Sequence, residues 1–123
     1  MRLRLFLGCA VALICTAPAG AQTAVQTIAL VSYGYSPKVI RLRAGQPVTL
    51  QFVNRSGKGH DFTAREFFAA SRITAGQVRN GEIDLKGGQS ASVTLVPARG
   101  TYKVHCGHPF HKAFGMKATI VVR

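Results

Sequence analysis

Side chains able to bind metals or react with substrates are concentrated near the end of the chain, in the stretch YKVHCGHPFHKAFGM (102–116). Five side chains there are of this kind: His105, Cys106, His108, His111 and Met116. Imidazole, thiolate and thioether groups are ligands of copper sites. A cysteine beside histidines also occurs in thiol enzymes, and a buried cysteine or methionine can simply fill a hydrophobic core. Spacing and the surrounding elements decide between these alternatives.

The spacing favours a single copper site. Two histidines, one thiolate and a weak methionine form a site suited to rapid electron transfer. Such a site needs one histidine from a distant strand and a Cys, His and Met from one loop between neighbouring strands. Cys106, His111 five residues later and Met116 five residues further have this layout, and His60 in NRSGKGHDFT is the only histidine outside the stretch. His108 is an alternative to His111, although it makes the spacing to Met116 too long for the pattern.

An enzyme is the competing interpretation. A thiol hydrolase needs an accessible, ionised thiol and an oriented base, whereas Cys106 continues an alternating strand pattern and is followed by Met116 at a ligand spacing. An oxidase or reductase would need a second copper or a substrate site, and one metal uses all four ligands. We therefore expect no enzymatic activity.

Short alternating or β-branched runs, separated by Gly and Pro turns, fill the chain from Thr27 onward. They predict seven or eight strands of an antiparallel β-sandwich, among them TIALVS, VIRLR, PVTLQFVN, GEIDL, SASVTLV, YKVHC and MKATIVV. AREFFAASRI is the one helical candidate, with Phe67 and Phe68 packed under it. Since alternate residues of a strand share a face, Cys106 is expected to point inward and His105 outward.

Residues 1–21 are predicted to be a signal peptide, which leaves one domain of residues 22–123. MRLR is positive, LFLGCAVALICTA is apolar but too short to span a membrane, and AGA is a small-residue cleavage site. We expect a periplasmic monomer without a transmembrane segment. Cleavage would also remove Cys9 and Cys15, so that Cys106 would be the only thiol in an oxidising compartment. Metal binding would protect that thiol.

The charge of the chain bears on its partners. The full sequence has a net charge of +12, and loss of Arg2 and Arg4 would leave 14 Lys and Arg against 4 Asp and Glu, a net of +10. This excess favours acidic partners or membrane surfaces. Nucleic acid is disfavoured because no recognition motif is present. We expect a redox partner protein with an acidic docking surface; a basic surface with no particular partner is the alternative.

In these residues the chain resembles the cupredoxin family, from about Thr27 to Arg123. The C-x4-H-x4-M loop is most similar to that of rusticyanin, and PxxIRLRAGQPVTLQFVN and KGGQSASVTLVPARGTYKVHC resemble the family's framework. The resemblance implies an all-β, Greek-key β-sandwich with one short helix. It also implies one copper ion per chain, cycling between Cu(I) and Cu(II), with the ligands His60, Cys106, His111 and Met116.

The function implied by the resemblance is that of a periplasmic electron-transfer protein with a mononuclear type 1 copper site. The alternative is a copper-binding module for resistance, storage or delivery, because His105, His108 and Asp61 would add ligands beside the loop. Asp61 departs from the family pattern, in which an Asn next to the first ligand His often ties the two ligand loops together. A carboxylate can still accept backbone N–H bonds near Cys106, and its charge would favour Cu(II) and a lower potential.

Overall fold

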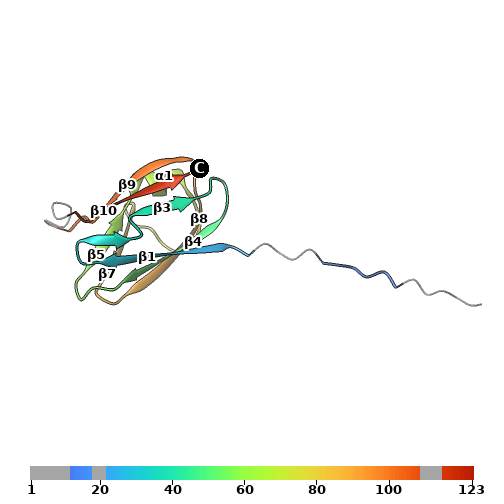
Figure 1. The fold of residues 1–123 in the computed structure, drawn as a ribbon, viewed down its shortest axis with the longest axis horizontal. Helices are drawn as coiled ribbons and strands as arrows, with labels where there is room; N and C mark the ends of the chain where they lie inside the picture. The colour runs from blue at the N-terminus through green and yellow to red at the C-terminus, as the bar shows by residue number, and fades with distance from the viewer. Residues whose placement is uncertain (1–11, 18–21, 109–114) are drawn as a thin grey trace, which may run out of the picture.

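A computed structural model of the chain describes residues 12–17, 22–108 and 115–123. Within these residues, ten strands and one helix form a sandwich of two five-stranded sheets (Figure 1). The first sheet has the order β2-β1-β4-β8-β6. Its strands are β1 (Ala24–Val31), β2 (Gly34–Ser36), β4 (Val48–Asn54), β6 (Arg72–Ala75) and β8 (Ser90–Val96).

The second sheet has the order β3-β10-β9-β5-β7. Its strands are β3 (Val39–Leu42), β5 (His60–Thr63), β7 (Glu82–Leu85), β9 (Gly100–His105) and β10 (Lys117–Val122). The fold class predicted from the sequence, an all-β sandwich with one short helix, is therefore confirmed. Residues 106–116, called the His-rich loop below, connect β9 to β10, and these two strands are neighbours in this sheet.

Both sheets are mixed, which corrects the prediction of a purely antiparallel sandwich. β1 runs parallel to β4, and β3 runs parallel to β10, whereas the other pairs of strands are antiparallel. The alternation of side chains is the same in parallel and antiparallel strands. It could therefore predict the strands and their faces but not their relative direction.

The inward faces of the two sheets form one hydrophobic core. Leu50 and Phe52 of β4 are fully buried while Gln51 between them is exposed, as the alternation predicts. Val93 and Leu95 of β8 are buried in the same way. Each large apolar side chain buried in this manner stabilises the fold by roughly 1.5–3 kcal/mol. The core thus holds the sheets together and supports the strand ends that carry the candidate ligands.

The helix α1 (Arg65–Ala70) connects β5 of the second sheet to β6 of the first and contacts β9 and β6. Phe67 and Phe68 are buried beneath it, as predicted. The rings of Phe67 and Tyr102 pack edge to face, with 5.4 Å between their centroids. The helix is shorter than AREFFAASRI because Ser71 has an extended backbone, with its N–H bonded to Phe67 O, and Arg72 begins β6.

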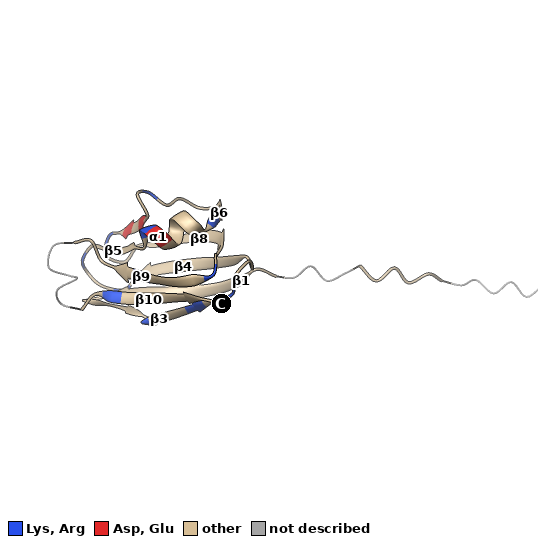
Figure 2. Ribbon diagram, turned by 90° about the horizontal axis from the view of Figure 1, so that it is seen from above, with Lys and Arg blue, Asp and Glu red and all other residues tan. Residues whose placement is uncertain are grey.

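The charged side chains are unevenly placed. All four acidic residues lie on β5, α1 and β7, and Figure 2 shows the Asp and Glu positions together beside α1 and β5, with Lys and Arg spread more widely over the chain. None of the helices in the described part of the chain has the length and apolar character needed to cross a membrane.

Candidate metal centre

The base of the His-rich loop brings its two sulfur-bearing residues side by side. β9 and β10 pair with His105 opposite Lys117, and the Cys106 N–H donates to the Met116 carbonyl oxygen at 3.2 Å. Cys106 is 1% exposed and Met116 is fully buried. The prediction that Cys106 points inward is thus confirmed, while His105 is half-buried. His111 lies outside the described residues.

His60 reaches the same end of the sandwich from the other sheet. The chain leaves β4 in the first sheet, crosses residues 55–59 and enters β5 in the second sheet, where Thr63 pairs with His105 of β9. His60 is the first residue of β5 and is 2% exposed. The turn of residues 55–59 therefore places a buried imidazole in β5, directly beside β9, which ends one residue before Cys106.

Asn54, the last residue of β4, shapes this crossing. Its buried amide donates to three carbonyl oxygens, at 2.8 Å to Lys58 and at 3.1 Å to both Leu85 and Lys86. Its oxygen accepts the N–H and the hydroxyl of Ser56. One buried side chain thus fixes the loop before His60 against the end of β7. Sequence analysis did not identify this residue, although an Asn at a strand end before a Gly-rich turn is a turn signal.

Asp61 ties β5 to the loop after Cys106. Its carboxylate accepts the Gly107 N–H with both oxygens, at 2.8 and 3.0 Å, and the Thr63 hydroxyl at 2.6 Å. Its backbone carbonyl accepts the Tyr35 hydroxyl at 2.6 Å. The expectation that a carboxylate here accepts backbone N–H bonds near Cys106 is confirmed.

The surroundings of Cys106 act on its thiol in opposite directions. Burial raises the pKa of the thiol, and the charges of Asp61 and Asp84 raise it further. Hydrogen bonds from the backbone of Asp61 and His108 lower it, because they stabilise the thiolate. Burial is the largest of these effects, so the pKa of the thiol is raised overall and the metal-free protein keeps the proton. A bound cation would supply the positive charge that releases it.

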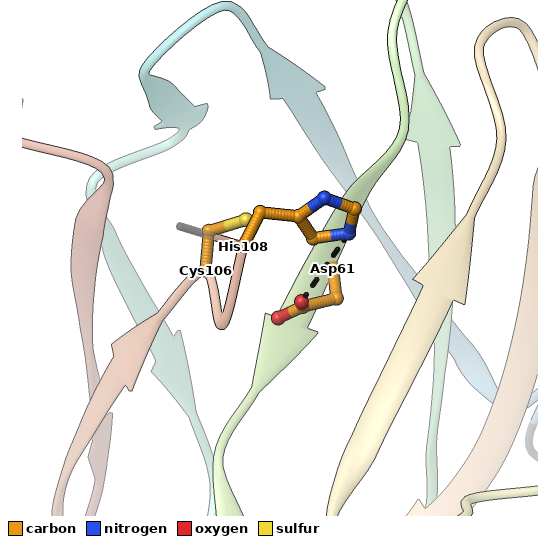
Figure 3. Close-up of side chains that lie close together, drawn as sticks. All are labelled: Asp61, Cys106 and His108. Carbon is orange, nitrogen blue, oxygen red and sulfur yellow. Dashed lines mark ion pairs between the residues drawn. The ribbon is translucent and has the colours of Figure 1, made fainter. Parts of the chain in front are cut away.

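His108, which the sequence analysis named only as an alternative to His111, lies close to the Cys106 thiol. Ligand atoms of Asp61, Cys106 and His108 all lie within 4.8 Å of one another, and Figure 3 shows the three side chains converging from β5 and the end of β9. His108 Nε2 is 3.7 Å from Asp61 Oδ2 and 3.5 Å from Asp84 Oδ1. The ring centroids of His108 and His60 are 6.3 Å apart.

Asp84 was not identified from the sequence. It lies on β7 directly opposite Asp61 of β5, and this register joins residues that are separated by α1 and β6. The alternation in GEIDL predicts that Asp84 faces outward, but nothing in the sequence says which strand lies beside it.

The donor groups at this end of the sandwich fit copper. A buried imidazole, a buried thiol that accepts backbone hydrogen bonds and a buried thioether come from His60, Cys106 and Met116. Soft sulfur ligands favour Cu(I), and imidazole binds both oxidation states. Oxygen-loving ions such as Mg²⁺ or Ca²⁺ would find no suitable ligand in the sulfur pair.

Comparison with known proteins agrees with this chemistry. The family model of the cupredoxin-like domain matches residues 4–122. No curated protein sequence matches the chain. Reduced auracyanin from the photosynthetic bacterium Roseiflexus castenholzii is 27% identical, with a TM-score of 0.62 over 85% of this chain and 99% of that one.

Two more distant structures share the fold alone. Auracyanin A, a blue copper protein from the green thermophilic photosynthetic bacterium Chloroflexus aurantiacus, is 21% identical, with a TM-score of 0.56 over 81% of this chain and 100% of that one. A multicopper oxidase from Campylobacter jejuni is 10% identical, with a TM-score of 0.64 over 89% of this chain and 32% of that one.

Proposed function

The chain belongs to the cupredoxin-like domain family, and from this premise we propose that it is a periplasmic electron-transfer protein with one mononuclear type 1 copper site. One observation carries the proposal: the backbone bond from Cys106 to Met116 holds two buried sulfur residues at the base of one loop, beside the strand that begins with buried His60. The structural neighbours of the chain include auracyanin A, which is described as a blue copper protein.

Four residues would hold the metal. Cys106 would supply the thiolate, His60 and His111 the two imidazoles, and Met116 the weak axial ligand; of these, only His111 is outside the described residues. Bound copper would supply one-electron chemistry between Cu(I) and Cu(II). The role of the sandwich is to keep the ligands in place in both states, so that little rearrangement accompanies electron transfer.

A basic hollow beside the site suits the proposed acidic redox partner. Lys103 and His105 of β9, Lys117 of β10 and Arg65 of α1 line a hollow of about 560 Å³, to which Glu66 adds the only carboxylate. Because β9 leads directly into Cys106, a partner bound there would lie next to the metal. The signal peptide of residues 1–21, the domain of residues 22–123 and the monomeric state belong to the same proposal. The intact mass of the exported protein tests the cleavage after Ala21.

Copper storage or delivery is the second candidate function. The observation that favours it is the group of Asp61, Cys106 and His108, since the carboxylate and the imidazole add an O and an N donor beside the Cys106 thiolate and would allow a metal to change partners. A delivery protein should release copper to a chelator, whereas an electron carrier should hold it and exchange electrons rapidly.

The visible spectrum of the exported protein with one equivalent of Cu(II) tests the proposal. We expect an intense band near ~600 nm that disappears in the Cys106→Ser variant, since the band arises from the thiolate–copper bond. His111→Ala should also lose the band, and His105→Gln, the control, should keep it. An unchanged spectrum in Cys106→Ser would overturn the type 1 assignment. Loss of the band in His108→Ala but not in His111→Ala would exchange the roles of these two histidines.

A further inference from the structure

Three of the four carboxylates of this basic chain surround one hollow beside Cys106. The hollow has a volume of about 360 Å³, and its charged and imidazole-bearing lining residues are Asp61, Glu82, Asp84, His105, His108 and Arg65. A chain with a net charge of +12 repels cations from most of its surface. The local gathering of acidic groups makes this hollow the place where a cation can approach.

Asp61 and Asp84 face each other across the β5–β7 pair. Like charges placed directly opposite one another are unfavourable in a sheet, and His108 lies against both carboxylates, at 3.7 and 3.5 Å. The side chain of His108 is 35% exposed and that of Asp84 is 68% exposed, whereas that of Asp61 is only 6% exposed. These three residues therefore lead from solvent into the protein.

The hydrogen bonds of Asp61 leave room for a cation on one of its oxygens. Oδ1 accepts from both Gly107 and Thr63, whereas Oδ2, the oxygen nearer to His108, accepts only from Gly107 among the hydrogen bonds described. A carboxylate has about four acceptor positions. Among the described residues that line the hollow, the one Lys or Arg is Arg65, which donates its Nε–H to the Asn80 carbonyl at 3.3 Å.

We propose that His108, Asp61 and Asp84 form a second cation site, which captures copper from solvent and passes it to Cys106. One imidazole and two carboxylates are ligands that Cu(II) accepts. The destination rests on the proposed function, but the capture site does not. Ligand atoms of Asp61 and His108 lie within 4.8 Å of the sulfur, so the transfer is an exchange of ligands. Bonds to the outer ligands are replaced by bonds to the inner ones, the thiol proton leaves to solvent, and no electron is transferred.

Titration with Cu(II), followed by visible absorption and electron paramagnetic resonance, tests the capture site. The wild-type protein is expected to bind two Cu(II): one blue, and one with the ordinary spectrum of N and O ligands. Cys106→Ser should keep the ordinary ion and lose the blue one. The double variant His108→Gln/Asp84→Asn should keep the blue ion and bind the other at least about tenfold more weakly. Glu66→Gln, which removes a carboxylate outside the hollow, should bind both.

The outcomes separate the two proposals. Binding of a single, blue Cu(II) by the wild-type protein, or an unchanged second ion in the double variant, would overturn the capture site and leave a His108–Asp61–Asp84 ion pair only. A wild-type protein that binds the ordinary ion but never turns blue would overturn the type 1 site and leave the capture site standing. Circular dichroism spectra that match the wild type would show that the variants are folded.

The rate at which the blue band develops tests the transfer step. With Cu(II) below one equivalent, formation of the band is expected to slow by about tenfold or more in the double variant, because capture is weakened. Glu66→Gln should develop the band at the wild-type rate. Equal rates in the wild-type protein and the double variant would show that copper reaches Cys106 by another route.

Discussion

The carboxylate of Asp61 holds the Gly107 N–H with both of its oxygens, at 2.8 and 3.0 Å. Gly107 directly follows Cys106, so one side chain fastens the loop after β9 to the strand that begins with His60. The contact is made entirely by protein atoms. The two segments that carry the proposed ligands are therefore already joined in the metal-free protein. Such a fixed arrangement suits a copper site, whose shape must be the same in both oxidation states.

Replacement of Asp61 by Ala should destabilise the metal-free protein. The variant removes the short acceptor of the buried Thr63 hydroxyl, which keeps only Glu82 at 3.5 Å, and a poorly satisfied buried group costs about 1–3 kcal/mol. The N–H of the exposed Gly107 also loses its acceptor, but water can replace it. Asp61→Asn should lose less, because one amide oxygen can still accept. The free energy of unfolding in urea measures both effects. An Asp61→Ala variant as stable as the wild type would show that water replaces the carboxylate without cost.

The copper-loaded Asp61→Asn variant should have a higher reduction potential than the wild type. A carboxylate near the metal favours Cu(II), and its Coulomb energy at about 5 Å in a medium of effective dielectric constant ~20 corresponds to a shift of at most roughly 140 mV. A redox titration measures the change. Glu66→Gln is the charge-matched control on α1 and should shift the potential much less. Equal shifts in the two variants would contradict a local effect of Asp61.

The parts of the site that the sequence predicted are those encoded by local alternation. Cys106 follows Val104 on the inward face of YKVHC, and its burial follows from that parity. Asp84 and His108 could not be placed in the same way. Their approach to Asp61 depends on the pairing of β5 with β7, and the pattern of either strand is compatible with several neighbours. The parallel pairs β1–β4 and β3–β10 escaped prediction for the same reason.

The stability of the metal-free protein should fall at alkaline pH in a way that depends on Cys106. Burial raises the pKa of its thiol, so the folded state holds the proton more tightly than the unfolded chain does. This contribution is complete below the ordinary thiol pKa of about 8.5 and is lost as the pH rises through the raised value. The loss of unfolding free energy between about pH 7 and about pH 10 should therefore be smaller in Cys106→Ala.

Tyr35 supplies the control for this experiment. Burial raises the pKa of its phenol as well, so Tyr35 contributes to the alkaline loss in the same direction. Tyr35→Phe should reduce the loss at and above about pH 10, the ordinary phenol pKa. The two contributions are coupled, because the charge of Cys106 is one of the causes that raise the pKa of Tyr35. If the unfolding free energy of Cys106→Ala depends on pH as that of the wild type does, deprotonation of the Cys106 thiol does not destabilise the folded state.

Asn54→Ala should be one of the most destabilising polar substitutions. It removes the donor of three carbonyl oxygens, on Lys58, Leu85 and Lys86, and a loss of more than about 2 kcal/mol is expected. The loop before His60 should loosen with it, which amide hydrogen exchange across residues 55–59 would detect. Gln51→Ala, on the exposed face of the same strand, is the control and should change stability little.

The basic hollow on the second sheet should steer anionic electron acceptors. In Lys103→Glu/Lys117→Glu, oxidation of the reduced copper protein by ferricyanide is expected to slow several-fold at low salt. The salt dependence should also weaken, because exposed charges are screened over about 10 Å at 0.1 M ionic strength.

Arg43→Glu, combined with Arg41→Glu to match the change in net charge, tests whether this steering is local. Arg41 lies near the end of β3 and Arg43 directly follows that strand; β3 runs parallel to β10, so its end lies away from the loop that holds Cys106. If net charge alone governed the reaction, both pairs of substitutions would slow ferricyanide equally. We expect a smaller effect from the arginine pair, because the lysines line the hollow that adjoins the proposed metal ligands.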